Sequence, residues 1–110
     1  MRYITAAVHD IMFKARIQDA VREQGHTVTF TQHVEDVIVS KPDILIVDLN
    51  FADFQPIESI RKLRQVLPPT LKIICFASHV DRDIQERAKH AGADVVMPRS
   101  RFVVQLPQFV

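Results

Sequence analysis

Acidic and amide side chains that suit metal or phosphoryl chemistry directly follow two apolar segments of the sequence. Asp48 and Asn50 come after the run Ile-Leu-Ile-Val at 44–47, and Asp10 follows the β-rich segment 3–8. Carboxylate oxygens are the ligands that Mg²⁺ prefers, and a carboxylate can also act as a nucleophile. If the fold brings Asp10 and Asp48 together, we expect either no cofactor or a weakly bound Mg²⁺. Each aspartate also has a purely structural interpretation, as a helix cap or a turn residue.

Further polar residues follow the other apolar segments at comparable positions. His9 and His79 could ligate a transition metal with the aspartates. Single surface histidines are commoner, so we expect both side chains to be solvated. Besides Asp48, the candidate residues lining a site are His9, Asp10, Asn50, Ala77, Ser78, His79, Arg99 and Ser100.

Glycine and cysteine counts exclude several classes of site. Gly25 and Gly92 are the two glycines, so the sequence contains neither a dinucleotide-binding G-x-G-x-x-G motif nor a P-loop. The single cysteine, Cys75, excludes an internal disulfide and a cysteine-rich zinc site. This cysteine usage fits a reducing compartment, and we expect a cytoplasmic protein.

Length and charge indicate one ordinary globular domain over residues 1–110. Hydrophobic residues make up 47% of the chain and charged residues 25%, which argues against disorder. Fourteen Lys and Arg oppose thirteen Asp and Glu, for a formal charge of +1. This balance predicts neither a nucleic-acid nor a membrane partner. The apolar run 44–47 is also far shorter than a membrane-spanning helix.

Short β-rich runs alternate with helical patterns along the chain. Pro56 fits the first turn of a helix that ends at Pro68, and Asp10 and Asp81 fit N-caps of helices that end at Gly25 and Gly92. We also expect a short helix over 34–39 and one or two final turns over 102–106, before Pro107. The predicted strands cover residues 3–8, 27–30, 44–47, 73–76 and 94–97.

Five strands separated by helices predict a parallel sheet with right-handed crossovers. The expected fold is an α/β, flavodoxin-like three-layer sandwich with strand order 2-1-3-4-5. The runs 44–47 and 73–76 are apolar throughout, so we place them at the centre of the sheet. The functional crevice of such a sheet lies beyond the carboxyl ends of its strands, where the polar residues gather.

Two stretches carry a resemblance to a known family. Residues 42–50, Pro-Asp-Ile-Leu-Ile-Val-Asp-Leu-Asn, resemble the receiver-domain strand that ends in the phospho-accepting aspartate. Residues 88–94, with their Ala-Gly-Ala-Asp turn, resemble the segment before the last receiver strand. Over nearly its full length the chain is similar to receiver domains of two-component response regulators. The resemblance implies that Asp48 occupies the phospho-acceptor position, and that the chain is a non-enzymatic signalling module with a histidine kinase or another signalling protein as partner.

Four positions differ from the family's pattern. His9 replaces one of the two acidic residues, and Asp10 matches the other. Ala77 occupies the hydroxyl position, Arg99 the lysine position and Val96 the aromatic position. We therefore expect a pseudo-receiver that acts through protein contacts, with phosphorylation lost or vestigial. The alternatives are a working phosphorelay receiver that uses Asp48, and a sensor of a small ligand or nucleotide in the strand-end crevice.

Three further expectations concern individual side chains. Arg99 should lie within ion-pairing reach of Asp48 or Asp10, where it would compete with a metal ion. Arg61, Lys62 and Arg64 should form a solvated basic face. The apolar tail 102–110 should mediate homodimerisation or docking of a partner if its side chains are exposed. Alternatively, Phe102 and Leu106 complete the core.

Overall fold

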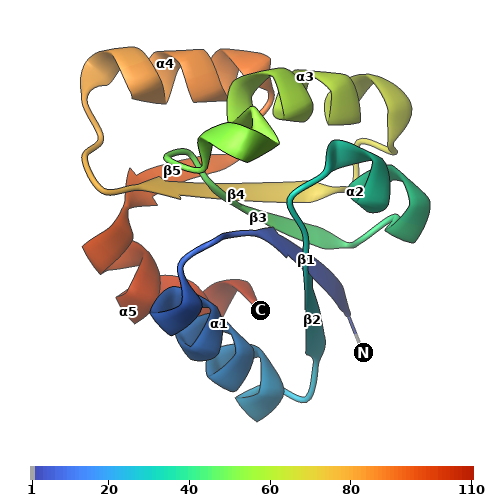
Figure 1. Cartoon of the computed structure of the whole chain (residues 1–110), viewed down its shortest axis with the longest axis vertical. Coiled ribbons are helices and arrows are strands. Elements are labelled where there is room, and N and C mark those ends of the chain that lie inside the picture. Colours follow the sequence, from blue (N-terminus) through green and yellow to red (C-terminus); the bar gives the residue numbers. More distant parts are fainter. Residues whose placement is uncertain (1) are drawn as a thin grey trace.

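Five parallel strands form one sheet in the order β2-β1-β3-β4-β5 (Figure 1), which confirms the predicted order. The structure is a computed structural model that describes residues 2–110. The strands are β1 (Tyr3–Ala7), β2 (Thr27–Phe30), β3 (Ile44–Asp48), β4 (Lys72–Ala77) and β5 (Val95–Pro98). The helices are α1 (Ile11–Glu23), α2 (Val34–Ser40), the 3₁₀ helix η1 (Ala52–Phe54), α3 (Pro56–Val66), α4 (Arg82–Ala91) and α5 (Arg99–Phe109).

The helices form two layers, one on each face of the sheet. Helices α1 and α5 lie on one face and α2, α3 and α4 lie on the other (Figure 1). Each layer encloses its own hydrophobic cluster, because successive side chains of a strand point to opposite faces. Along β3, Leu45 and Val47 belong to the α2–α4 cluster, whereas Ile44 and Ile46 belong to the α1–α5 cluster. All five residues of β3 are buried, as expected for the central strand.

Local capping signals define the helix ends as the sequence predicts. Asp10 accepts a hydrogen bond from the Phe13 backbone N–H at 2.9 Å and so caps α1. Asp81 caps α4 in the same way. Gly92 follows α4 with a φ of 130°, a conformation that glycine adopts without steric cost.

The final helix differs from the prediction. Helix α5 spans Arg99–Phe109 and contains Pro107, although we expected only residues 102–106 to be helical. Pro107 lacks one backbone donor, but it lies near the end of the helix, where the loss affects one turn. Val110 is buried in the core and Phe109 packs against it, so tertiary contacts stabilise this last turn.

The hypothesis of an exposed apolar tail is wrong. Phe102, Leu106 and Val110 are buried against the sheet, and Val103 and Phe109 are partly buried. Only Val104, which is 75% exposed, is a large apolar side chain of α5 that faces solvent. Most of the tail therefore completes the core, as the alternative interpretation predicts, and Val104 remains exposed. Homodimerisation through the tail stays a prediction.

Arg64 does not belong to a solvated basic face. Its guanidinium donates to the backbone oxygens of Gly92 and Leu71 at 2.8 and 2.7 Å, and to the Asp94 carboxylate at 2.7 Å. Asp94 also accepts a hydrogen bond from the Ile73 N–H at 2.8 Å. Because these contacts join α3, the start of β4 and the α4–β5 turn, Arg64 holds the layer together at the amino end of β4.

No helix within residues 2–110 is long and apolar enough to cross a membrane.

Replacing Phe102 tests the role of the tail in stability. The Phe102 ring stacks on Phe76 with centroids 4.7 Å apart, and it lies 5.8 Å from the Phe13 ring. We expect Phe102→Ala to lower the free energy of unfolding by about 3–5 kcal/mol, measured by urea denaturation. The exposed Val104→Ala on the same helix should change it by less than about 0.5 kcal/mol. Similar effects of the two variants would contradict the packing of α5.

Replacing Arg64 tests the junction between α3 and the α4–β5 turn. Arg64→Met keeps the apolar stem but leaves the Gly92 and Leu71 carbonyls without the guanidinium donor, and leaves Asp94 with the Ile73 N–H alone. We expect a loss of about 1–3 kcal/mol in the free energy of unfolding. Arg61→Met on the same helix removes only an exposed pair with Glu58, with an expected loss below about 1 kcal/mol. Thermal denaturation of both variants would show whether the two arginines differ.

Candidate functional site

The candidate site lies at the edge of the sheet where the parallel strands end. Asp48 is the last residue of β3, Ala77 the last of β4, and Arg99 directly follows β5. His9 and Asp10 follow β1 in the loop that leads to α1. The strand order thus brings to one edge residues that are widely separated in the sequence.

Asp48 is a buried carboxylate with two different partners. Its side chain accepts a hydrogen bond from the Asn50 N–H at Oδ1, 2.8 Å away, and Oδ2 lies 3.5 Å from Arg99 Nη2. The residue is only 5% exposed. Burial raises the pKa of Asp48 above its ordinary value, and the nearby Asp10 acts in the same direction. The Asn50 hydrogen bond and the Arg99 charge oppose this rise in pKa without cancelling it.

Arg99 makes the ion pair that its position predicts, and it is held there by aromatic rings. The guanidinium carbon lies 5.1 Å from the Phe13 centroid and 5.8 Å from the Phe76 centroid. Both distances are within the range of cation–π attraction. Arg99 Nε is buried and has no hydrogen-bond partner within residues 2–110. Apolar and aromatic packing, more than hydrogen bonding, therefore positions this cation next to Asp48.

Asn50 links the two loops beside Asp48. Its side-chain oxygen accepts a hydrogen bond from the Ser78 N–H at 2.7 Å. Ser78 therefore contributes its backbone to the site, while Ala77 is buried and has no hydroxyl group. The sequence placed Asn50 and Ser78 at neighbouring strand ends, but no local pattern indicated this hydrogen bond.

The remaining predicted residues lie around the edge without forming a metal centre. The Asp10 side chain is engaged as the cap of α1, and the His9 ring stacks on Phe51 with centroids 5.3 Å apart. His79 and Ser100 are exposed. Within residues 2–110, no group of three or more His, Cys, Asp or Glu side chains is arranged to hold a metal ion.

The side chains at this edge do not fit the weakly bound Mg²⁺ that Asp10 and Asp48 led us to consider. One oxygen of Asp48 is bound to Asn50, and the other faces the permanent positive charge of Arg99. His9 stands where a second acidic residue of the loop would be needed. A divalent cation here would have two carboxylates as ligands and would be repelled by the guanidinium.

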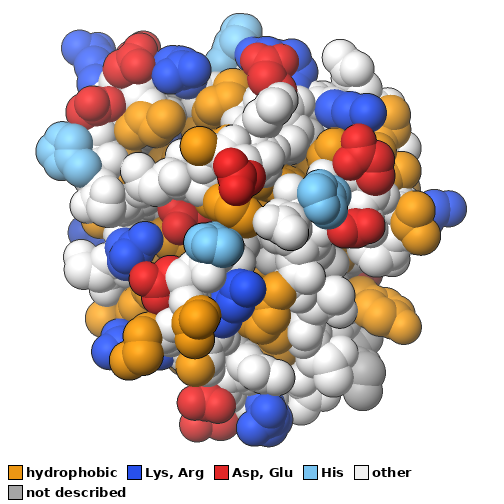
Figure 2. Space-filling view, in the orientation of Figure 1, with side chains coloured by type: hydrophobic (Ala, Val, Ile, Leu, Met, Phe, Trp, Pro, Cys, Tyr) orange, Lys and Arg blue, Asp and Glu red, His pale blue; other side chains and the backbone are white. Residues whose placement is uncertain are grey.

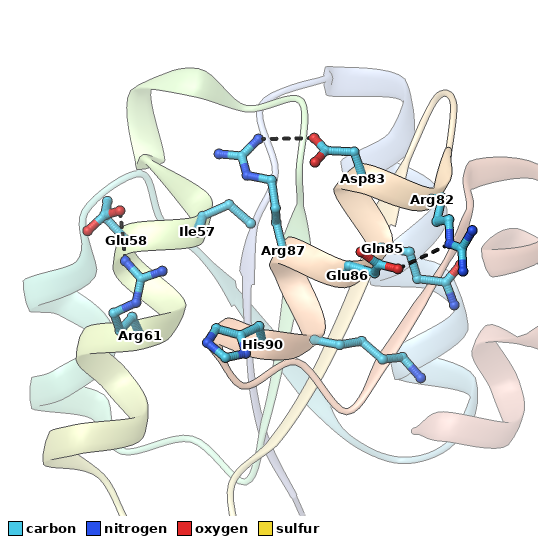
Figure 3. A pocket seen from close by; sticks show the side chains of 10 residues that line it. Ile57, Glu58, Arg61, Arg82, Asp83, Gln85, Glu86, Arg87 and His90 are labelled. Atoms are coloured by element: carbon cyan, nitrogen blue, oxygen red, sulfur yellow. Dashed lines mark hydrogen bonds and ion pairs between the residues drawn. The ribbon is translucent and has the colours of Figure 1, made fainter.

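A separate groove of about 930 Å³ lies between α3 and α4, away from the strand ends (Figure 3). Six of its charged side chains pair within their own helices, whereas Lys89, which also lines the groove, is in no ion pair within residues 2–110. The distances are 2.9 Å for Glu58–Arg61, 3.2 Å for Arg82–Glu86 and 3.8 Å for Asp83–Arg87 (Figure 3). These three pairs neutralise most of the charge that lines the groove. The strand-end site differs from this groove because it contains a buried carboxylate, Asp48, next to Arg99.

Comparison with known proteins identifies the fold. No protein-family model and no curated protein sequence matches the chain. A response regulator from Thermotoga maritima has a TM-score of 0.82 at 18% identity, covering 99% of this chain and 93% of that one. The response regulator domain of Thermotoga maritima CheB has a TM-score of 0.84 at 17% identity, covering 99% and 92%.

A third similar structure is a protein that is not named as a response regulator. A pilus assembly-related protein from Burkholderia pseudomallei has a TM-score of 0.73 at 22% identity, covering 99% of this chain and 86% of that one. Sequence identities this low show similarity of fold, and the matched backbone covers nearly the whole chain. The chain therefore has the fold of response-regulator receiver domains.

Proposed function

We propose that the chain is a receiver-like signalling module of two-component type that acts through protein contacts, without phosphorylation of Asp48. The observation that carries this proposal is the placement of Arg99. Its guanidinium lies 3.5 Å from the Asp48 carboxylate and is packed over Phe13 and Phe76. The guanidinium therefore pairs with the same carboxylate that an incoming phosphoryl group would have to reach.

Two further features of the site oppose phosphoryl transfer. Phosphoryl transfer depends on positioned cations that neutralise developing charge and on an ionised nucleophile. Burial raises the pKa of Asp48, so the charged carboxylate is more costly to maintain here than in water. Ala77 cannot donate a hydrogen bond to a phosphoryl oxygen, so even a phosphorylated Asp48 would not draw the β4–α4 loop inward through this residue. These features support a module whose surface does not switch by phosphorylation.

The distribution of charge supports a protein as partner. On the face drawn in Figure 2, Lys and Arg side chains are interspersed with Asp, Glu and His. The formal charge of the chain is only +1, and phosphate-backbone binding needs several clustered cations. We infer that this chain is a non-enzymatic, cytoplasmic adaptor, with a histidine kinase or another signalling protein as its partner.

Phosphorylation assays test the proposal directly. We expect wild-type protein to remain unmodified, by intact-protein mass spectrometry, after incubation with acetyl phosphate and Mg²⁺. A triple variant, His9→Asp, Ala77→Thr and Arg99→Lys, restores the acidic, hydroxyl and lysine groups and should gain one phosphoryl group. Its control carries Asp48→Asn in addition and should not react.

The alternative, a working phosphorelay receiver, makes the opposite prediction. Stoichiometric Mg²⁺-dependent modification of wild-type Asp48 would overturn the proposed loss of phosphorylation. Modification of the triple variant alone would identify the altered residues as its cause. If neither protein reacts while both remain folded, the backbone of the site itself is unsuited to phosphoryl transfer, which still agrees with the proposal.

The pH dependence of stability tests the burial of Asp48. Because its pKa is raised on folding, the folded protein binds more protons than the unfolded chain between the two pKa values. The free energy of unfolding should therefore fall as pH rises through this window, and the cost of the buried charge is complete at neutral pH. Asp48→Asn removes the charge and keeps an acceptor for the Asn50 N–H.

We expect Asp48→Asn to raise Tm at neutral pH by roughly 4–8 °C for each ~1 kcal/mol gained. The gain should disappear as pH falls well below about 3.9, the ordinary pKa of aspartate, because the carboxyl group is then protonated in both states. Calorimetry of Asp48→Asn and of the exposed control Asp53→Asn would measure both effects. A gain that is independent of pH, or equal in the control, would show that desolvation of Asp48 is not its source.

A further inference from the structure

A second hollow lies at the carboxyl ends of β1 and β2, beside the Asp48 site. Its volume is about 320 Å³, and its wall includes His9, Lys14, Phe30, Thr31, His33 and Phe51. We call it the β1–β2 pocket. We propose that the β1–β2 pocket binds a small planar anion, an aromatic or heteroaromatic ring that carries a carboxylate or a phosphate.

The pocket contains a lysine that makes no ion pair with the described part of the chain. Lys14 is partly buried, and within residues 2–110 it has no carboxylate within ion-pairing distance. Its Nζ lies 5.6 Å from the centre of the Phe30 ring. Asp36 also lies in the wall and keeps its negative charge, but its Oδ2 accepts a hydrogen bond from the Thr31 hydroxyl at 2.9 Å and makes no ion pair with Lys14. Lys14 is therefore available to an anionic group of a ligand, and that group would gain a charged hydrogen bond.

Aromatic rings form part of the pocket wall. The His9 ring is stacked on Phe51 at an interplanar angle of 25°, which gives one side of the pocket a flat face. Phe30, the partly buried last residue of β2, provides a second aromatic ring in the wall. Planar ligands bind to such faces by offset stacking. Together with Lys14, these rings match a ligand that combines a flat ring with negative charge.

The position and size of the pocket set limits on the ligand. In open α/β sheets, ligands bind beyond the carboxyl ends of the strands, where this pocket lies. Small-molecule sites range over about 300–1,000 Å³, so a volume of about 320 Å³ suits a single ring system and excludes a dinucleotide. Without a glycine-rich loop, recognition of the anion must come from side chains. This proposal is independent of whether Asp48 is phosphorylated.

Paired probes test the proposal on the full chain. Each anion is compared with its neutral counterpart at millimolar concentration: benzoate with benzamide, and adenosine monophosphate with adenosine. We expect at least one anion to shift the backbone amide NMR signals of His9, Thr31 and His33, and its neutral counterpart to shift them much less. Larger shifts with benzoate would indicate that the pocket prefers a carboxylate, and larger shifts with adenosine monophosphate would indicate that it prefers a phosphate.

Lys14→Met should weaken binding of the active anion about tenfold, because it removes the charged donor and keeps the apolar stem. Lys62→Met, an exposed change on α3, is the matched control and should leave affinity unchanged. Equal binding of neutral and anionic probes, unchanged affinity in folded Lys14→Met, or no localised shift with any probe would each overturn the proposal.

Discussion

Burial of β3 on both faces is the constraint on which the rest of this structure depends. The strand lies at the centre of the sheet, between β1 and β4, and divides its side chains between two hydrophobic clusters. Its last residue is Asp48, so the same burial that stabilises the sheet also takes a carboxylate out of water. The raised pKa of Asp48 and its need for a nearby cation both follow from that position.

The cation beside Asp48 is Arg99, and its guanidinium packs against aromatic rings of the hydrophobic core. Phe13, Phe76 and Phe102 stack on one another below the site, and the Arg99 guanidinium lies over two of these rings. The site and the core therefore share residues, and a change in ring packing would also move the charge beside Asp48. A mobile lysine on the same backbone could approach and leave the carboxylate, whereas a guanidinium stacked on aromatic rings is held in place.

The strand-end edge of the sheet thus has two chemically different parts. Around Asp48 the polar groups bind to one another: Asn50 contacts both Asp48 and Ser78, and Arg99 contacts Asp48. In the β1–β2 pocket, by contrast, Lys14 pairs with no carboxylate within residues 2–110. His9 connects the two parts, since it precedes Asp10 and stacks on Phe51 in the pocket wall. Ligand binding in the pocket would therefore act on the loop that leads into α1, without chemistry at Asp48.

The sequence by itself determined the strands, their order and the helix caps, because apolar runs, proline positions and the Asp10 and Asp81 caps act through neighbouring residues. It also placed Asp48 and Arg99 at one edge, since parallel strands end together. Only the tertiary structure decided that α5 continues through Pro107, that Arg64 binds Gly92, and that Arg99 packs on two phenylalanine rings. Those outcomes depend on contacts between residues far apart in the chain, where burial and long-range hydrogen bonds outweigh local propensity.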